Sequence, residues 1–542
     1  MQLLLLLVVA LTITVALIPP LANAAGRFRL LDRPGERKVH AVPIPRIGGI
    51  AMVAGTLLPL AIYTLPGEWG AIYAGVGILL TMGLLDDRFE LTWPWKLAAQ
   101  VLACALAVQA GGVSIEAATL SDRIELPAAV SFLLSFVFLV GVTNAINLSD
   151  GLDGLAGGTT LLSVLAIGWI SFTAGNYPVA ATTAALTGAL LGFLRFNTHP
   201  ARVFMGDSGS QVLGFLAGVV AIKATQGAEA TVSAALPLLL LAWPILDTLA
   251  VMTERMRAGR SPFSADRRHF HHRLLTLGFD HYQSVLIIYA VQGALFLLAY
   301  LLRYESDVLI GAAFVAFAGI VIGLLEGARV TGWQLSRAAP GPSQIARRVR
   351  WLAEHDRLAR GCRALLLLLL GAYAASVAIA PLAVSPDVAV LAAVLAMLHA
   401  VVLVSGNRPT SVLLLRGALF VAAAMLVYLD QQSLGGLAPR SAAIAAIFGA
   451  LALLVLLRFR VSGERRFAFT TLDALVLFVA IVAPFIAGAS ESASSVALGI
   501  LKLVALGYAL EFALEQWRVA RGGALVAALL LAWVAGRGVL PM

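Results

Sequence analysis

The residues best suited to chemistry lie between two long apolar segments, where carboxamides and carboxylates recur every three positions. The set, whose last two members each precede a glycine, is Asn144, Asn147, Asp150 and Asp153. An acidic group facing lipid at mid-bilayer would cost roughly 2.5–3.5 kcal/mol, so such groups persist at membrane depth only where they face a bundle interior or an aqueous cavity. On a straight helix Asn144 and Asp153 would lie about 180° apart, so we expect Gly151 and Gly154 to interrupt it. Ordinary helix capping is the simpler alternative, but the density of polar groups favours a functional site.

Two further acidic motifs lie at the ends of apolar segments. Asp86 and Asp87 are adjacent, and their mutual repulsion favours a bound cation, a basic partner or one raised pKa. A solvated loop with surface acids is the alternative. Asp207 belongs to the sequence Gly-Asp-Ser-Gly-Ser at 206–210, which opens another apolar segment. The backbone amides of such a helix start can bind phosphate, and the aspartate can hold a divalent cation.

A basic, histidine-rich segment follows later in the same half of the chain. Its candidate ligand-binding residues are Arg267, His269, His271 and His272. Three histidines in four residues are compatible with zinc, but no cysteine and no histidine pair four residues apart accompany them. A loop that only sets membrane topology would not need histidines. We therefore interpret these side chains as donors to a pyrophosphate or a sugar nucleotide.

The composition predicts an all-α, polytopic membrane helix bundle. The chain has 542 residues, of which 60% are hydrophobic and 12% are charged, and its mean hydropathy is +0.92. The net charge of +9 comes from Lys and Arg in short loops, which is the pattern that sets membrane topology and does not indicate nucleic acid as a partner. The two cysteines, Cys104 and Cys362, exclude a disulfide framework.

Apolar segments of membrane length divide the chain into three parts. We expect about 10–11 transmembrane helices in a first membrane domain at 1–328, a basic cytoplasmic linker at 329–363, and about seven helices in a membrane module at 364–542. Residues 1–25 are interpreted as the first membrane helix and not a signal peptide, since the basic residues follow the apolar core. The other expected helices of the first part span 47–65, 71–85, 97–110, 127–147, 155–174, 179–196, 211–225, 230–253, 284–302 and 308–325.

These motifs resemble those of the polyprenyl-phosphate N-acetylhexosamine-1-phosphate transferase family of bacterial envelope synthesis. The matching residues occur in the family's order over roughly 1–330: Arg37-Lys38-x-His40 with Pro45-Arg-Ile-Gly-Gly49, Asp86-Asp87, Lys96, Asn144-x-x-Asn147-x-x-Asp150-Gly-x-Asp153-Gly-Leu, Gly206-Asp207-Ser-Gly-Ser, and Asp266-Arg-Arg-His269-Phe-His271-His272. The resemblance implies transfer of a sugar 1-phosphate from a UDP-sugar to undecaprenyl phosphate, with release of UMP. It implies Mg²⁺, with Mn²⁺ as an alternative, and an active site facing the cytoplasm at the bacterial inner membrane. The His-Phe-His-His sequence resembles the corresponding sequence of the family branch that uses simple UDP-N-acetylhexosamines.

Roles for the candidate residues follow from the chemistry that this resemblance implies. We assign Asp207, with Asp87 or Asn147, to the metal, and Asp86 to a position beside the acceptor phosphate. Asp150 and Asp153 would orient the uridine diphosphate or metal-bound waters. The candidates for substrate binding are Lys96, Asn144, Arg267, His269, His271, His272, Lys38 and Arg46. Direct attack by the acceptor phosphate and a covalent intermediate on an aspartate both remain open.

A transporter or lipid flippase that uses buried acids is the alternative function, and it predicts polar groups near the middle of broken helices in two related halves. Here the polar groups cluster at one end of the helices. Residues 364–542 lie outside the resemblance and could form a scaffold, or a second unit with a site of its own. Isolated charges in this part, such as Lys502, can snorkel from helix ends. A homodimer is one open arrangement.

Overall fold

The computed structural model describes most of the chain and shows helices separated by short connections. The described residues are 2–34, 42–62, 67–120, 122–226, 232–259, 261, 269–335, 356–379, 384, 386–404, 409–432, 438–461, 470–487, 491–513 and 517–539. Within them, nine helices are long and apolar enough to cross a membrane, judged by length and composition. The predicted all-α, polytopic membrane fold is confirmed.

The chain divides into two units. The first comprises Gln2–Arg337 together with Thr470–Leu475, and the second comprises Ala338–Phe469 and Val476–Met542. Much of the predicted linker at 329–363 lies outside the described residues, because the description stops at 335 and resumes at 356. The two units are described separately below.

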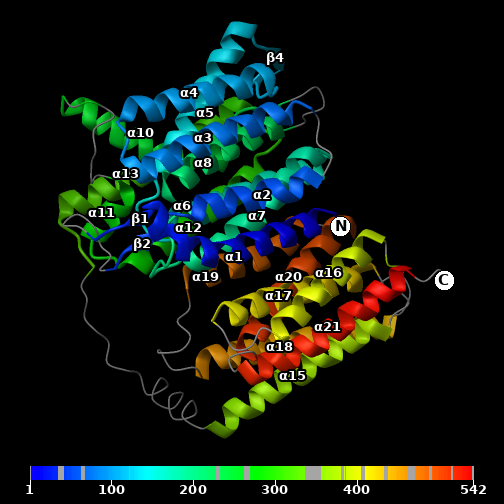
Figure 1. Ribbon diagram of the computed structural model, residues 1–542. Helices are drawn as coiled ribbons and strands as arrows, with labels where there is room; N and C mark the ends of the chain where they lie inside the picture. Colours follow the sequence, from blue (N-terminus) through cyan, green and yellow to red (C-terminus); the bar gives the residue numbers. More distant parts are fainter. Residues whose placement is uncertain are drawn as a thin grey trace. The chain divides into compact units, whose positions relative to one another are not determined.

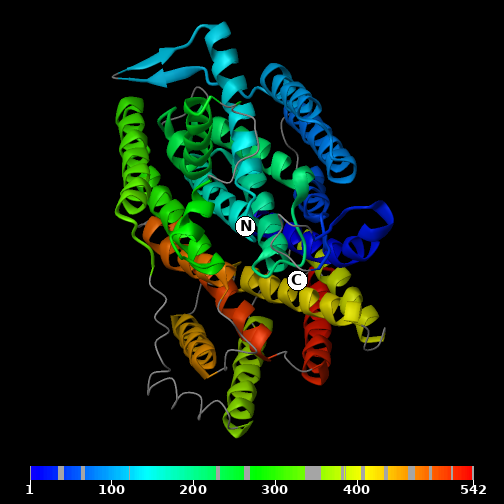
Figure 2. The same ribbon diagram turned by 90° about the vertical axis from the view of Figure 1, so that its left-hand side faces the viewer.

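The first unit is built from the helices α1 to α13. Their bounds are α1 Gln2–Phe28, α2 Gly48–Ile62, α3 Trp69–Phe89, α4 Trp93–Ala110, α5 Ala128–Leu148, α6 Leu155–Thr173, α7 Tyr177–Asn197, α8 Gly206–Thr225, α9 Leu236–Leu240, α10 Ala242–Arg257, α11 Phe270–Thr276, α12 His281–Leu301 and α13 Asp307–Thr331. Two short strand pairs join them, β1 Leu31–Asp32 with β2 Ile44–Pro45 and β3 Ala117–Thr119 with β4 Arg123–Glu125. The second pair is the cyan hairpin in Figure 2.

Helix α8 lies at the centre of this unit. In the apolar segment of α8, 94% of the residues are buried, whereas in that of α13 only 6% are buried. It packs against α2, α3, α5 and α6, and Figure 1 shows α3 beside it. The residues at the start of α8 are therefore surrounded by the ends of several other helices.

The break predicted in the helix that carries Asn144 and Asn147 is confirmed. Helix α5 ends at Leu148 and α6 begins at Leu155, with Gly154 at a φ of +82° between them. This left-handed conformation favours glycine, because a side chain would clash with the backbone. Asn144 and Asn147 therefore lie on α5, whereas Asp150 and Asp153 lie in the loop between the helices.

The prediction of a single helix at 230–253 is wrong. The structure has the short helix α9, a turn at Leu241, and then α10. Pro244 has no N–H to donate to the carbonyl of Leu240, four residues earlier. The side chain of Gln292 on α12 donates to that carbonyl instead, at 2.9 Å. A distant polar side chain thus compensates for the break.

Two connections near the site contain short regular elements. The segment 43–49 contains β2, whose next residue, Arg46, pairs with Phe204 in an isolated bridge. The histidine-rich loop ends in α11, which includes His271 and His272. The following helix, α12, begins at His281 because Asp280 and Gln283 form a reciprocal capping box.

In the part of the chain after 355, the described residues form seven helices. They are α15 Asp356–Ile379, α16 Pro386–Val404, α17 Pro409–Gln432, α18 Ala438–Val461, α19 Thr471–Ala487, α20 Glu491–Ala513 and α21 Trp517–Val539. In the second unit, Lys502 Nζ lies 2.6 Å from Asp430 Oδ2, and both side chains are buried. Tyr373 Oη lies 3.4 Å from the same carboxylate oxygen. Lys502 is thus paired inside the bundle.

This ion pair predicts how the second unit responds to loss of one charge. Lys502→Met should destabilise it strongly, because removing one partner of a buried pair costs about 3–5 kcal/mol. Adding Asp430→Leu should restore most of the loss, since no buried charge then remains. Thermal unfolding of the wild type, both single variants and the double variant in detergent tests this. A double variant no more stable than Lys502→Met would contradict it.

Candidate active site

Asp87 joins α3 to the start of α8. Its Oδ1 accepts the backbone N–H of Asp207 at 3.0 Å, and its Oδ2 accepts the N–H and hydroxyl of Ser208 at 3.2 and 2.9 Å. A carboxylate at a helix N-terminus is favourable because it satisfies free amides and opposes the helix dipole. These two amides are therefore already occupied, and the phosphate site predicted at the start of α8 is not formed by them.

Lys96 on α4 lies between two of the predicted acids. Its Nζ is 2.5 Å from Asp86 Oδ2 and 2.7 Å from Asp207 Oδ2. Asn147 Nδ2 donates to the other oxygen of Asp207 at 3.0 Å and to the hydroxyl of Ser210 at 2.7 Å. Four helices thus bring one basic and four polar side chains to a single point.

Arg46 approaches the same cluster from the connection between α1 and α2. Its Nη1 is 3.9 Å from Asp87 Oδ1, and it also forms an ion pair with Asp32. We define the carboxylate cluster as Asp86, Asp87, Asp150 and Asp207, with the basic partners Lys96 and Arg46. With Asp32, which also pairs with Arg46, five carboxylates face two basic side chains, so three negative charges are in excess when all seven groups are ionised.

Asp150 lies in the loop beside this cluster. Burial, followed by the negative charges of Asp207, Asp153 and Asp87, raises the pKa of Asp150 to about 7. An acid with a pKa in this range is one whose charged form the surroundings disfavour. A cation or a cationic donor that joined the cluster would stabilise the ionised carboxylate.

Two predicted residues make contacts other than those expected. Asn144 Nδ2 donates to Gln100 Oε1 at 2.6 Å, and Gln100 in turn donates to Gln211 at 3.2 Å. Asn144 therefore belongs to an amide network between helices. Asp153 Oδ2 lies 2.7 Å from His199 Nδ1 and accepts the N–H of Ala201 at 3.0 Å. Its carboxylate thus holds the loop that follows α7.

His269 is fixed by an acid that the sequence analysis missed. Asp247 on α10 is 2% exposed. Its Oδ2 lies 2.9 Å from His269 Nδ1, and its Oδ1 accepts the N–H of Phe270 at 2.7 Å. Asp247 could have been found in the sequence as an acid within an apolar segment. The same reasoning identified the polar residues from Asn144 to Asp153. Asp247 orients the imidazole and leaves its Nε2 available to a ligand.

His271 approaches the loop between α5 and α6 more closely than any side chain on Gly151 would allow. A Cβ at position 151 would overlap with His271 Nε2. His271 is 2% exposed, and its Nε2 has no hydrogen-bond partner among the described residues. Burial, followed by the nearby His272, lowers the pKa of His271 to about 3. His271 is therefore neutral at physiological pH.

His272 adjoins these residues, since its ring centroid lies 4.2 Å from that of His271. Two predicted site residues, Lys38 and Arg267, lie outside the described residues. The structure brings the other predicted acids and histidines to the end of α3, the loop after α5, the start of α8 and the start of α11.

Comparison with known proteins gives matches that cover about half of the chain. Residues 69–225 match the model of Glycosyl transferase family 4. A Bacillus subtilis protein, "Probable undecaprenyl-phosphate N-acetylglucosaminyl 1-phosphate transferase", is 34% identical over 287 residues, which cover 52% of this chain and 79% of that protein. "Decaprenyl-phosphate N-acetylglucosaminephosphotransferase" of Mycolicibacterium smegmatis is 37% identical over 302 residues, covering 50% and 74%. "Undecaprenyl-phosphate alpha-N-acetylglucosaminyl 1-phosphate transferase" of Escherichia coli is 32% identical over 294 residues, covering 53% and 80%.

The contact of His271 with Gly151 predicts a rescue. Gly151→Ala should destabilise the first unit by about 1–3 kcal/mol, the usual cost of overpacking. His271→Ala should relieve the overlap, so the double variant should lose less than the two single losses added together. Gly141→Ala is the matched control, because a Cβ there meets nothing within 4 Å. Thermal unfolding of these proteins measures the coupling, and strictly additive losses would exclude the contact.

The lowered pKa of His271 predicts a pH dependence of stability. Between about 6.5 and about 3 the unfolded chain binds a proton here that the folded chain does not. Stability should therefore fall as the pH falls through this interval. His271→Gln removes this titrating imidazole. The melting temperature of the variant should therefore fall less than that of the wild type over the same pH interval. An equal or larger fall in the variant would contradict the assignment, because all other titrating groups are shared.

Proposed function

The chain belongs to glycosyl transferase family 4, and on that premise we propose that it transfers N-acetylglucosamine 1-phosphate from a UDP-sugar to undecaprenyl phosphate and releases UMP. The names of the relatives support an N-acetylglucosaminyl group and a polyprenyl-phosphate acceptor. The multi-pass membrane fold suits an acceptor with a lipid tail. The reaction would be the first membrane step of envelope polysaccharide synthesis.

The observation that carries this proposal is the carboxylate cluster at the end of the central helix. Asp87 and Asp207 lie against each other across α3 and α8, with Lys96 and Asn147 in contact with Asp207. Such a group of acids and bases can receive a phosphorylated ligand and the cation that accompanies it. Since all the groups lie near the ends of the helices, a soluble donor and a membrane-embedded acceptor could meet there.

We propose Mg²⁺ as the cation, held by Asp207 with Asp87 or Asn147. The fit rests on two features of the site: its acidic donors are oxygen atoms, which Mg²⁺ prefers, and its carboxylates outnumber its basic partners. Mg²⁺ bound there would neutralise phosphate charge during the transfer.

The acceptor phosphate needs little activation by the protein. Its second pKa is near 6, so roughly nine-tenths is the dianion at pH 7. An oxygen of this phosphate would attack the phosphorus bonded to the sugar. The bond from that phosphorus to the UMP oxygen breaks, and UMP leaves with the bonding electrons. Lys96, whose ammonium contacts Asp86 and Asp207, is the basic side chain proposed to reduce the repulsion between these anions.

Direct attack is favoured over a covalent aspartyl intermediate by the contacts of the acids. Both oxygens of Asp87 accept hydrogen bonds from the start of α8. Asp86 accepts the N–H of Leu91 at 2.7 Å through Oδ1 and contacts Lys96 through Oδ2. A carboxylate held in this way is a weaker nucleophile than a free one. The histidines beside Gly151 would bind the donor, with His269 Nε2 directed by Asp247.

The site is proposed to face the cytoplasm of the bacterial inner membrane. The donor is a soluble nucleotide sugar, and the basic connecting loops support this orientation through the positive-inside rule. The C-terminal unit has no assigned part in the transfer.

This proposal predicts metal-dependent release of UMP by the purified full-length protein. With undecaprenyl phosphate and Mg²⁺, UDP-N-acetylglucosamine should react, and a chelator should stop the reaction until Mg²⁺ is restored. Asp207→Asn should reduce the rate about 10²–10³-fold, the loss typical when one charge-stabilising group is removed. The matched control is Glu125→Gln, which replaces an exposed carboxylate on β4 and should keep full activity.

A panel of donors separates the proposed sugar from its alternatives. It should contain UDP-N-acetylglucosamine, UDP-N-acetylgalactosamine and UDP-N-acetylmuramyl-pentapeptide. Release only with the pentapeptide donor would overturn the sugar assignment while keeping the reaction class. No UMP from any donor, in protein shown to be folded by its melting curve, would overturn the transferase proposal.

A further inference from the structure

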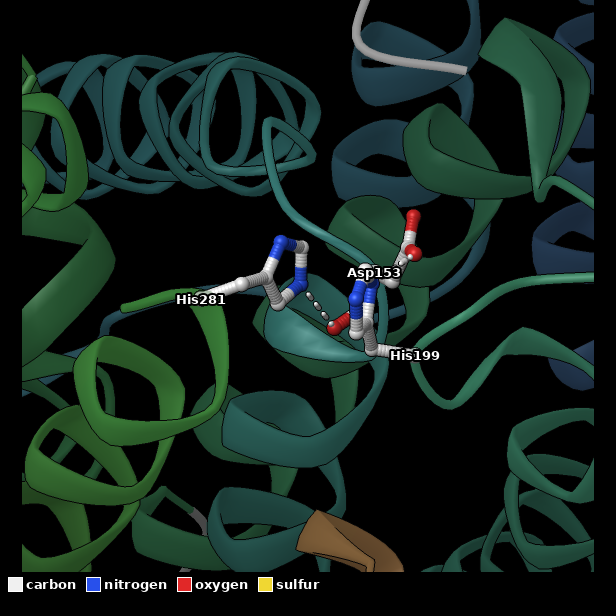
Figure 3. A group of neighbouring side chains, drawn as sticks. All are labelled: Asp153, His199 and His281. Atoms are coloured by element: carbon white, nitrogen blue, oxygen red, sulfur yellow. Dashed lines mark hydrogen bonds and ion pairs between the residues drawn. The ribbon is translucent and has the colours of Figure 1, made fainter. Parts of the chain in front are cut away.

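A second group of candidate ligands lies apart from the contacts of Asp87, Lys96 and Asp207. Asp153 comes from the loop after α5, His199 from the connection after α7, and His281 from the first position of α12. One ligand atom from each of the three residues lies within 4.8 Å of the other two. Figure 3 shows the imidazole rings of His199 and His281 facing each other, with dashed lines from His281 to the backbone oxygen of Asp153 and from His199 to its carboxylate.

The contacts within this group are short. His199 Nδ1 lies 2.7 Å from Asp153 Oδ2, and His281 Nε2 lies 3.4 Å from the backbone carbonyl oxygen of Asp153. The two imidazole rings are stacked, with centroids 4.1 Å apart and planes inclined by 21°. Three segments that are distant in sequence therefore converge on one aspartate.

The chemistry of these donors differs from that of the carboxylate cluster. Two imidazole nitrogens and one carboxylate oxygen form a ligand set that suits zinc and other borderline transition-metal ions. Mg²⁺ prefers oxygen ligands, which the cluster around Asp207 supplies. Two cations of different character could thus be bound in neighbouring parts of the same unit.

We propose that Asp153, His199 and His281 bind a transition-metal ion such as Zn²⁺, at a site separate from the one proposed for Mg²⁺. The ion would take the place of the contact between His199 Nδ1 and Asp153 Oδ2. His199 is the ligand that must turn most, because stacked rings do not direct both nitrogens to one point. Its side chain is 44% exposed, which leaves room for this rotation. Three protein ligands would leave a fourth position for water.

Occupation of this site would act on the loops and not on the transfer itself. The loop after α7 leads to Phe204, which pairs with Arg46, and then directly to Asp207. Asn197, the last residue of α7 before this loop, already contacts Gly154, because its Oδ1 accepts the Gly154 N–H at 2.9 Å. An ion shared by His199, Asp153 and His281 would add the start of α12 to this connection. This proposal does not depend on the transferase reaction.

Binding can be measured directly with Co²⁺, which reports its coordination by visible absorption. The full-length protein, purified without a histidine tag and stripped of metal, would be titrated with Co²⁺ in excess Mg²⁺. We expect saturable uptake with a visible spectrum of mixed nitrogen and oxygen ligands. Zn²⁺ should displace the Co²⁺, whereas further Mg²⁺ should not. Folded protein that takes up no Co²⁺ would show that His199 and Asp153 form only a hydrogen bond, and would overturn the proposal.

Matched variants locate the ion. His199→Gln and His281→Gln should each weaken binding of Co²⁺ and Zn²⁺ at least about tenfold, because each removes one of three protein ligands. His272→Gln makes the same chemical change on α11 and should leave the affinity unchanged. Loss of binding in His272→Gln, with retention in His199→Gln, would place the ion elsewhere and overturn the assignment. Melting curves would show that each variant is folded, and the exposure of His199 makes its replacement the safest of the three.

Discussion

The hydrogen bonds from the start of α8 to the carboxylate of Asp87 are the interaction on which the site depends. Helix α8 is enclosed by its neighbours, so its first amides must find acceptors within the protein. Asp87 supplies them from the end of α3. The same contact fixes the direction of Asp207, which then meets Lys96 and Asn147. One structural requirement of a buried helix thus assembles the groups proposed to act on phosphate.

Close packing of backbones makes this contact possible. A Cβ at Gly83 would overlap with the backbone of Ser208, so α3 and α8 can approach at this level only because the residue is glycine. Small residues at helix interfaces have this role in membrane proteins, where burial of apolar surface gives little preference for protein over lipid. Asp87 lies one helical turn beyond Gly83, and its distance from α8 follows from the closeness of the two helices.

The sequence was sufficient to predict the helical membrane fold, the break beside Gly154 and the set of acids near the helix ends, because these follow from hydropathy, glycine and the cost of buried charge. Their partners were not predictable, since a contact such as that of Asp87 with Asp207 and Ser208 joins segments far apart in the chain. The direction of Asp153 toward His199 depends on a loop conformation that has no periodic signal. The turn at Leu241 could have been inferred from Pro244, but its compensation by Gln292 could not.

The excess of negative charge in the carboxylate cluster constrains the order in which ligands bind. A nucleoside diphosphate that approached Asp86, Asp87, Asp150 and Asp207 without a cation would be repelled, although Lys96 and Arg46 offset part of the charge. Burial raises the pKa of Asp150 most, and the negative charges of Asp207, Asp153 and Asp87 raise it further, which is the same repulsion acting within the protein. A donor arriving as its Mg²⁺ complex, or after Mg²⁺, would instead meet a neutralised site. On the proposed reaction, the acids therefore select the metal-bound form of the donor, and His271, which contacts Gly151 and has a lowered pKa, supplies an uncharged side chain beside them.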